Sequence, residues 1–290
     1  MFAPKTILVT GASRGIGLLT VKSLANAGHY VFAAMRDLQG RNNAIARELI
    51  DWAEENDLTL ETVEMDVTNE SSVNATIQAI EKDRSINVLI NNAGIMPTGL
   101  TEAFTPEQIK ACFDVNVLGP ARACRAVLPH MRDRRSGLLI HISSTAGRVA
   151  IPFFGVYCAS KWALEAYAES LHYELAPFGI ESILVEPGGH STDLVKTAPA
   201  PTDQDCLLGY GKFADGRDQM LGMFERMFAV GENITDAQNV ADKIVDLIEM
   251  KGPRPIRTTV GQDMGLNQIN ANVAPVQSEL IKSLADRVKF

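Results

Sequence analysis

Two side chains that could move a proton stand four residues apart in the stretch VYCASKWALEAYAES, at residues 156–170. They are Tyr157 and Lys161, and a spacing of four places them on one face of a helix. A tyrosine with its usual pKa of about 10 is a poor acid–base group at neutral pH, but a neighbouring cation stabilises the phenolate and lowers that pKa. Such a tyrosine could protonate a developing alkoxide or deprotonate an alcohol. The spacing alone also fits a surface or core-edge pair without chemistry.

A second chemical signal is the glycine-rich stretch TGASRGIG, which contains Gly11, Gly15 and Gly17. It lies between the first apolar run and the first helix-like segment. Glycines there allow a tight turn and close approach of the backbone to a pyrophosphate, and the helix that follows offers free N–H groups to that anion. The position predicts a dinucleotide site, while the alternative is a tight turn without a ligand.

The glycine spacing is G-x-x-x-G-x-G rather than the commoner G-x-G-x-x-G. In this spacing, and in five motifs that follow it, the sequence resembles the short-chain dehydrogenase/reductase family over about residues 1–260. The five motifs are NNAG at 91–94, Asn116 in DVNVLG, Ser144 in ISSTAG, the Y-x-x-x-K of Tyr157 and Lys161, and PGGHST at 187–192. The stretch around Tyr157 is similar to the estradiol 17β-dehydrogenase and retinol dehydrogenase branch.

The resemblance implies a role for each catalytic motif residue. Tyr157 would be the general acid or base, and Ser144 would hydrogen-bond the substrate carbonyl, with Ser143 as the competing candidate. Lys161 would also bind the nicotinamide ribose, and Asn116 would hold a water that links Lys161 to solvent. Asn116 could instead be a polar residue inside a helix that bonds only to the backbone.

The cofactor-binding residues implied by the resemblance come from the same motifs. Asn92, Ala93 and Gly94 would line the adenine ribose, and Asp66 with Val67 would meet the adenine, unless Asp66 only caps the helix that follows. Thr192 would contact the carboxamide, unless it is only a turn residue. The full expected set is Gly11, Ser13, Arg14, Gly15, Ile16, Gly17, Arg36, Asp66, Val67, Asn92, Ala93, Gly94, Tyr157, Lys161, Pro187, Gly188 and Thr192.

The end of the second apolar run bears on the choice between NADP(H) and NAD(H). NAD-binding relatives carry an acidic residue there that holds the 2′-hydroxyl, and here Met35 takes that place by resemblance. Arg36 follows it and Arg14 lies in the glycine loop, so two guanidiniums could bind a 2′-phosphate. Asp37 could pair with Arg36, and both arginines could simply be solvated. We expect NADP(H) to be preferred over NAD(H).

The segment 188–234 departs from the regular alternation of strands and helices. A proline-punctuated loop is followed by a helix-like stretch with an apolar stripe, made of Met220, Met223, Phe224, Met227 and Phe228. Such a stripe could be ordinary core, but family members carry the substrate lid in this place, and methionine adapts to irregular apolar shapes. The expected substrate contacts are Ser144, Phe153, Phe154, Tyr157 and Phe224, which favours a bulky hydrophobic ketone, aldehyde or secondary alcohol.

Strand-like and helix-like segments alternate along the chain, which predicts a doubly wound parallel sheet of about seven strands in one Rossmann domain over residues 1–290. The strands are expected at 6–10, 30–35, 60–65, 86–91, 137–143, 179–186 and 254–260. The helices are expected at 16–28, 41–56, 69–83, about 106–134, about 156–176 and 235–250. The C-terminal extension, 261–290, could form a last helix that closes the pocket or contacts a neighbour.

Bulk composition limits the class of protein. The 290 residues are 46% hydrophobic and 21% charged with a net charge of −8, typical of a soluble globular protein and unfavourable for general nucleic-acid binding. Cys112, Cys124, Cys158 and Cys206 match no metal or disulfide pattern. No run approaches the roughly 20 apolar residues of a membrane span. We expect a cytoplasmic protein with no metal site and no membrane span.

These features together predict a short-chain NADP(H)-dependent carbonyl reductase or alcohol dehydrogenase. Two other functions share the fold: a non-redox nucleotide-sensing regulator, and an epimerase or dehydratase. The intact set of Asn116, Ser144, Tyr157 and Lys161 favours the oxidoreductase. The helices at 106–134 and 156–176 resemble the family's dimer-forming pair, so a homodimer or homotetramer is expected.

Overall fold

A computed structural model describes residues 3–190, 192–229 and 236–287. Its centre is a parallel sheet of seven strands in the order β3-β2-β1-β4-β5-β6-β7. The strands are β1 (Thr6–Thr10), β2 (Tyr30–Met35), β3 (Leu60–Glu64), β4 (Val88–Asn91), β5 (Gly137–Ile142), β6 (Ile180–Pro187) and β7 (Arg257–Val260). Each overlaps a strand expected from the sequence, so the predicted fold class is confirmed.

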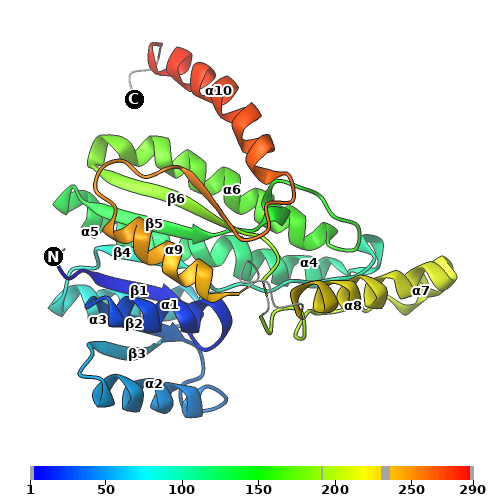
Figure 1. Cartoon of the computed structure of the whole chain (residues 1–290), viewed down its shortest axis with the longest axis horizontal. Coiled ribbons are helices and arrows are strands. Elements are labelled where there is room, and N and C mark those ends of the chain that lie inside the picture. The colour runs from blue at the N-terminus through cyan, green and yellow to red at the C-terminus, as the bar shows by residue number, and fades with distance from the viewer. Residues whose placement is uncertain (1–2, 191, 230–235, 288–290) are drawn as a thin grey trace.

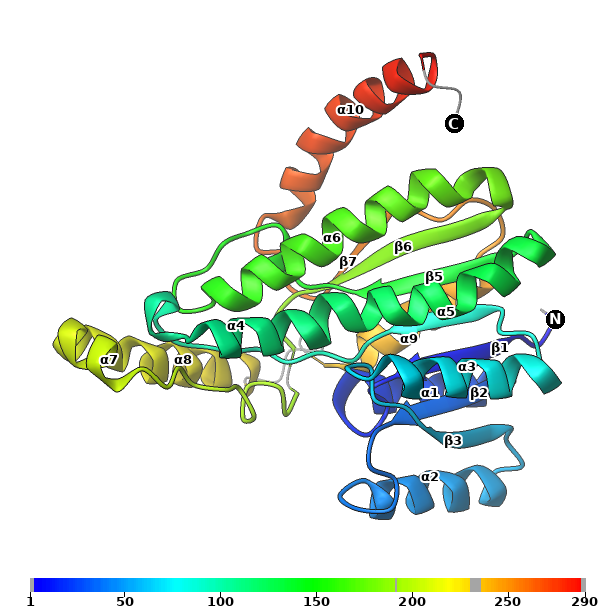
Figure 2. The same ribbon diagram turned by 180° about the vertical axis from the view of Figure 1, so that it is seen from behind.

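Helices cover both faces of this sheet. They are α1 (Gly15–Asn26), α2 (Asn43–Glu55), α3 (Glu70–Asp83), α4 (Pro106–Phe113), α5 (Gly119–Arg134), α6 (Gly155–Leu175), α7 (Gln204–Tyr210), α8 (Gly216–Ala229), α9 (Gln238–Glu249) and α10 (Leu266–Ala285). One face packs against α1, α2 and α9, which lie in front of or below the strands in Figure 1. The other packs against α3, α5 and α6, seen from behind in Figure 2.

Burial on both faces explains why the strands are apolar runs rather than alternating ones. Ile7, Leu8 and Val9 of β1 are fully buried, and successive residues point to opposite helical layers. In the parallel register, Ile7 pairs with Val31 on one side and with Val88 on the other. The strand order reverses at β1, between β2 and β4, and ligands of such sheets bind where the strands end at this reversal.

The helical stretch expected at 106–134 is not one regular helix. A π-helical turn, Asp114–Leu118, separates α4 from α5. Such turns insert an extra residue into the helical ladder and occur frequently at functional sites. The buried Asn116 lies in this turn, so the interruption sets the direction of a predicted site residue.

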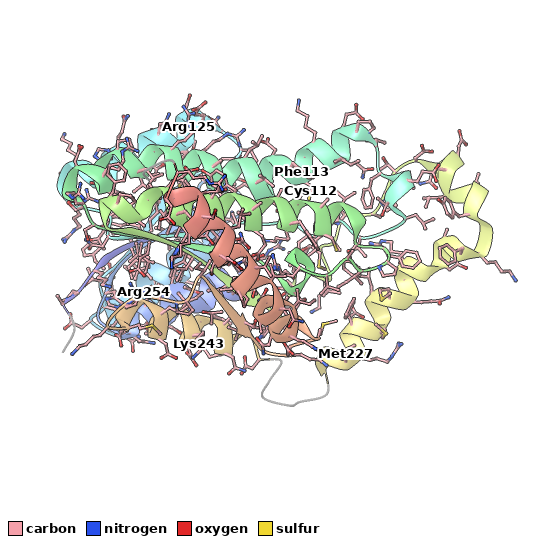
Figure 3. The ribbon with its side chains drawn as sticks, turned by 90° about the horizontal axis from the view of Figure 1, so that it is seen from above. Cys112, Phe113, Arg125, Met227, Lys243 and Arg254 are labelled. Carbon is pink, nitrogen blue, oxygen red and sulfur yellow. The ribbon has the colours of Figure 1, made fainter. Side chains whose placement is uncertain are left out.

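Two segments leave the main body of the fold. The helices α7 and α8 form a hairpin that projects from the end of the molecule that carries α4, on the right of Figure 1. Helix α10 lies above α6 and β6 in Figure 1 and crosses over them in the view from above in Figure 3. It begins at Leu266, within the extension where a last helix was expected, and Pro275 lies inside it.

Candidate active site

The glycine loop after β1 is shaped by backbone contacts that exclude larger residues. Gly11 has a φ of 67°, and a Cβ on it would lie 2.8 Å from the Ala93 Cα atom. A Cβ on Gly17 would lie 2.4 Å from both the Asn92 Nδ2 atom and the Gly11 carbonyl oxygen. The start of α1 carries no side-chain cap, because Arg14 precedes the helix without capping it. Its first N–H groups therefore remain available to an anion.

The ends of β1 and β4 are tied together at the same point. The Asn92 side-chain amide donates to the carbonyl oxygens of Thr10 and Gly11, at 2.9 and 3.1 Å. In return, the Thr10 hydroxyl oxygen accepts from the backbone N–H groups of Asn92 and Ala93, at 3.0 and 3.1 Å. The NNAG motif thus fixes the glycine loop, in addition to any contact that it makes with a ligand.

A cavity of about 440 Å³ runs from this loop along the ends of the strands. All of the cofactor-binding residues expected from the sequence contribute to its lining, as do four of the five expected substrate contacts. Phe153 does not line it: its ring packs on Phe213 with centroids 5.5 Å apart, on the side of the α7–α8 hairpin. We therefore leave Phe153 out of the proposed substrate wall.

Tyr157 and Lys161 lie on one face of α6 beside this cavity, and both are buried. The Lys161 ammonium donates to the Ile142 carbonyl oxygen at 2.7 Å and lies 5.8 Å from the centre of the Tyr157 ring. Burial raises the pKa of Tyr157, and a hydrogen bond with Ser144 only partly opposes that rise. The expectation of a lowered Tyr157 pKa from Lys161 alone is therefore wrong for the protein without a cofactor. The cost of burying the Tyr157 phenolate outweighs any stabilisation that the Lys161 charge gives it.

Ser144 and Ser143 point to different surroundings. Ser144 is partly exposed, caps the 3₁₀ turn Thr145–Gly147 and hydrogen-bonds Tyr157. Ser143 is 3% exposed, and its hydroxyl would lie 2.6 Å from a Cβ added to Gly147. Of the two candidates, the geometry favours Ser144 as the partner of Tyr157.

Asn116 is held by its side chain between two segments. Its amide donates to the Ile95 carbonyl oxygen and to the Ser160 hydroxyl oxygen, both at 2.9 Å, and its Oδ1 atom accepts from the Ile95 N–H at 2.9 Å. The two bonds to Ile95 fit the alternative of a polar residue bonded to the backbone, and the bond to Ser160 adds a side-chain partner. Asn116 does not line the cavity but flanks Gly94 together with Lys161, so its role in proton relay stays a prediction.

The adenine end of the cavity carries more cations than the sequence suggested. Arg14 and Arg36 line it, and so does Arg41, which the sequence analysis missed. Asp37 pairs with Arg41, with 3.8 Å between the Arg41 Nε and Asp37 Oδ2 atoms, in an exposed contact. Asp37 therefore pairs with Arg41 and not with Arg36, as the sequence had left open. The only available signal for Arg41 was its place in the loop after β2.

Asp66 also lines the adenine end, and its carboxylate serves the local turn. Its Oδ1 atom accepts from the Thr68 N–H and hydroxyl at 2.9 and 2.8 Å. The cap of α3 is Asn69, which accepts from the Ser72 N–H at 3.1 Å. The alternative that Asp66 caps this helix is therefore wrong.

The opposite end of the cavity is apolar. Phe154, Tyr157 and Phe224 belong to one buried cluster, and Met220 and Met227 of α8 pack against it. Phe154 and Phe224 meet edge to face with ring centroids 5.4 Å apart. Met223 faces solvent at 40% exposure, whereas the side chain of Phe228, residue 191 and residues 230–235 lie outside the described part of the chain.

His190 and Thr192 border the same space from the loop after β6. His190 is 6% exposed and lines the cavity. Its Nδ1 atom lies 3.0 Å from the Gly188 carbonyl oxygen, and burial lowers its pKa. Thr192 lines the cavity too, with its methyl group near Gly15, so it is not only a turn residue.

Comparison with known proteins agrees with this geometry. The family model described as short chain dehydrogenase matches residues 5–203. The chain belongs to the short-chain dehydrogenase/reductase family. It is an oxidoreductase of that family by this match and by its relatives.

Three curated relatives have names that bear on the branch. The human 17-beta-hydroxysteroid dehydrogenase type 1 is 38% identical over 87% of this chain and 76% of its own length. The human retinol dehydrogenase 8 is 35% identical over 88% and 81%. The 3-ketodihydrosphingosine reductase of Bacteroides thetaiotaomicron is 34% identical over 89% and 88%. The branch suggested by the sequence around Tyr157 is thus confirmed.

A solved structure has the same fold throughout its length. The short-chain dehydrogenase from Streptomyces avermitilis superposes with a TM-score of 0.75 at 29% identity, covering 99% of this chain and 98% of that one. Two further observations concern membrane-spanning helices and metal sites. Among the described helices, none is long and apolar enough to cross a bilayer. The described residues also contain no cluster of three or more His, Cys, Asp or Glu side chains arranged to hold a metal.

Proposed function

We propose that this oxidoreductase transfers a hydride between NADP(H) and a bulky hydrophobic ketone, aldehyde or secondary alcohol, with Tyr157 as the proton donor or acceptor. One observation carries the proposal. The cavity that begins at the glycine loop ends between Ser144, Tyr157 and the apolar side chains of Phe154 and Phe224. A dinucleotide laid along it would bring its reactive ring to the tyrosine hydroxyl.

The residues at the glycine loop fit a dinucleotide. Gly11 and Gly17 leave spaces that a Cβ would fill, and the uncapped start of α1 offers N–H groups to a pyrophosphate. Arg14, Arg36 and Arg41 supply positive charge where the adenine ribose would lie. An exposed guanidinium binds a phosphate with charge-assisted bonds, which favours the 2′-phosphate of NADP(H).

The proposed chemistry uses three side chains. A substrate oxygen would accept hydrogen bonds from the Ser144 and Tyr157 hydroxyls, which lie next to each other. The bound cofactor supplies or accepts the hydride at the carbonyl carbon. Tyr157 gives its proton to the oxygen during reduction and takes one during oxidation. Lys161 holds a positive charge near the ring and stabilises the phenolate that reduction leaves behind.

The raised pKa of Tyr157 bears on the direction of the reaction. A tyrosine that is fully protonated at neutral pH is ready to act as an acid, and reduction of a carbonyl needs an acid first. Oxidation needs the phenolate first, and the charge of a bound oxidised nicotinamide would favour that form. We therefore propose carbonyl reduction as the easier direction near neutral pH.

The apolar end of the cavity supports a bulky substrate. Phe154 and Phe224 line it beside Tyr157, and Met220 and Met227 of α8 pack against the same cluster. The names of three relatives refer to a steroid, a retinoid and a sphingoid. All of these are large, apolar molecules with a single reacting oxygen function.

The proposal can be tested with a panel of carbonyl compounds and both reduced cofactors. The loss of NADPH absorbance should be fastest with steroid-, retinoid- or sphingoid-sized ketones and slow with small aldehydes. The Tyr157→Phe variant serves as the control for background oxidation. If the panel gives no turnover above that variant while NADPH still binds, the chain is not the proposed reductase.

We also propose that the protein forms a homodimer or homotetramer through α5 and α6. Leu118, before α5, and Trp162, on α6, are each 48% exposed, and large apolar side chains exposed on neighbouring elements favour association. Light scattering should give a multiple of the chain mass. A Trp162→Glu variant should shift that mass towards the monomer, and an unchanged mass would exclude this face.

A further inference from the structure

Four ionisable side chains follow one another at every fourth position along one face of α6. Tyr157, Lys161, Glu165 and Glu169 have exposed fractions of 6%, 5%, 2% and 7%. Side chains four residues apart on a helix lie one above the other. The first two are the proposed proton donor and its lysine, whereas the two glutamates have no part in the mechanism described above.

One arginine binds both glutamates. The Arg257 Nε atom of β7 donates to Glu165 at 2.9 Å, and its Nη2 atom donates to Glu169 at 2.6 Å. A third carboxylate, Glu186 of β6, lies 3.6 Å from the same Nε atom and is fully buried. Three carboxylates therefore share one guanidinium, and the cluster has more negative than positive groups.

The proton in this cluster is expected on Glu186 rather than on Glu165. Burial, followed by the repulsion of Glu165, raises the pKa of Glu186 to about 7. Burial also raises the pKa of Glu165, but its direct bond to Arg257 opposes that rise. A carboxylate bound by a guanidinium keeps its charge more readily than one held at longer range. Glu165 is thus the anion that stands one helical turn from Lys161.

Lys161 needs such an anion. Its ammonium donates to one neutral carbonyl oxygen, that of Ile142. Burial lowers the pKa of Lys161 to about 8, and the opposing influences are those of Cys112 and Glu165. Burial raises the pKa of the Cys112 thiol, so that group is neutral at moderate pH. Glu165 is left as the charged group that favours the ammonium form.

We propose that Glu165 is a positioning residue that acts through Lys161: its buried carboxylate, anchored by Arg257, keeps the lysine ammonium charged beside Tyr157. The inference rests on the proposed function of Tyr157 and Lys161. It extends the working site along α6 by a further turn, to a contact between residues 92 positions apart in the sequence.

Other titratable groups also face this part of α6. Arg148 lies near Glu165 and Glu186, after the 3₁₀ turn, and adds a second cation to the cluster. His141 of β5 is fully buried, and its pKa falls to about 3, because of burial first and Lys161 second. His141 is therefore neutral, and among the described residues the charged neighbours of the Lys161–Glu165 pair are Arg148, Arg257 and Glu169, while Glu186 holds the proton.

The test compares glutamine variants of the two glutamates that bind Arg257. Glu165→Gln and Glu169→Gln each remove one negative charge bound to Arg257, but Glu169 lies two turns from Lys161. The pKa of Lys161 is measured in the full-length protein from the NMR titration of ¹³Cε-labelled lysine, with Lys161→Arg to assign the signal. Glu165→Gln should lower that pKa by about one unit or more. Glu169→Gln should leave it unchanged.

Enzyme kinetics give a second measurement. Because Lys161 would lose its proton at lower pH without the Glu165 charge, the alkaline fall of kcat/KM for reduction should move to lower pH in Glu165→Gln only. The Glu165→Asp variant keeps the charge and should restore the wild-type profile. An equal shift in both glutamine variants, or a Lys161 titration that no variant moves, would overturn the inference.

The NMR titration separates this inference from the proposed function, because it needs no turnover. A protein that reduces no carbonyl but shows the Lys161 shift contradicts the function and supports the pairing. If Glu165→Gln does not fold, the neutral pair Glu165→Gln with Arg257→Met replaces it. The Arg257 guanidinium bonds both Glu165 and Glu169, so it lies beside α6 and farther from Lys161 than the Glu165 carboxylate does. The Lys161 pKa should therefore still fall, and an unchanged value would refute the proposal.

Discussion

The two ends of the cavity are built in different ways. At the cofactor end, Thr10 and Asn92 lock the glycine loop with four hydrogen bonds between the ends of β1 and β4. At the substrate end, the α7–α8 hairpin stands off the sheet, and Phe224, Met220 and Met227 of α8 belong to a cluster with Phe154 and Tyr157. One of the hairpin's polar anchors is Arg217, which donates to the Thr98 and Ala198 carbonyl oxygens at 2.8 and 3.1 Å.

Exposure separates the two ends as well. Leu208 and Phe213 of the hairpin are 77% and 63% exposed, while Ile7 to Val9 of β1 are fully buried. A loop built on a rigid scaffold can change without unfolding the scaffold. The difference supports the proposal that the sheet holds the cofactor and that the hairpin selects the substrate.

The largest expected effect comes from a change at Tyr157, which lies where the cofactor end and the substrate end of the cavity meet. Tyr157→Phe takes away only the transferable proton, so turnover should fall by about 10²–10⁴-fold while NADPH affinity stays nearly unchanged. Single-turnover rates and a fluorescence titration of NADPH measure the two quantities. Lys161→Ala should weaken both, because one side chain is proposed to serve catalysis and the ribose. A near wild-type kcat in Tyr157→Phe would remove the assigned acid.

The next effect tests the rigidity of the cofactor end. In Gly17→Ala the new methyl group would lie 2.4 Å from the Asn92 amide nitrogen and the Gly11 carbonyl oxygen. The loop must shift, and the Kd for NADPH should rise roughly tenfold or more, which is about 1.4 kcal/mol.

A glycine of the hairpin is the matched control for this change. In Gly222→Ala the methyl group would meet only the flexible end of Arg226, at 3.4 Å. NADPH affinity should therefore be unaffected. Equal losses in the two variants would contradict the contrast between a rigid and an adaptable end.

Much of the sheet and of the cofactor site could be predicted from the sequence, because local patterns determine them. A buried parallel strand is an apolar run, and the glycines of the loop are required by contacts within a few residues of a strand end. The catalytic motif residues also come together as expected. Tyr157, Lys161 and Ser144 follow from spacing along one helix and from one strand end.

The features that were missed depend on contacts between distant segments. Glu165 and Arg257 meet through the pairing of β6 with β7 and the packing of α6, which no local pattern encodes. The direction of the Tyr157 pKa depends on burial, and burial is a property of the whole fold. Phe153 adopts a φ of 67°, and its ring packs on Phe213 instead of lining the cavity. A β or α pattern in the sequence does not reveal such a conformation.

A further effect concerns the charge near Arg14 and Arg36. Arg36→Asp replaces an exposed guanidinium of the cavity lining with a carboxylate, which repels a 2′-phosphate and can accept from a 2′-hydroxyl. The ratio of kcat/KM for NADPH to that for NADH should fall roughly ten- to a hundredfold, since charged hydrogen bonds are worth about 1.5–3 kcal/mol. Arg41→Met should change the ratio less, because Asp37 already offsets part of the Arg41 charge. An unmoved ratio in both variants would argue against NADP(H) preference.

The smallest effect decides what the substrate end is for. Phe224 is 8% exposed, lines the cavity and packs edge to face on Phe154, so it could select substrates or simply fill the core. Burial of a Phe-sized contact is worth about 1.5–3 kcal/mol. If it closes over substrate, Phe224→Ala should raise KM for a bulky ketone about tenfold or more relative to a small one. Met223→Ala, an exposed change on the same helix, should leave that KM ratio unchanged.

If Phe224 only fills the core, Phe224→Ala should lower Tm, and the ratio of KM for the bulky ketone to KM for the small one should stay constant. The apolar-substrate proposal would then lose its main structural support, and the hairpin would be a stabilising appendage rather than a lid.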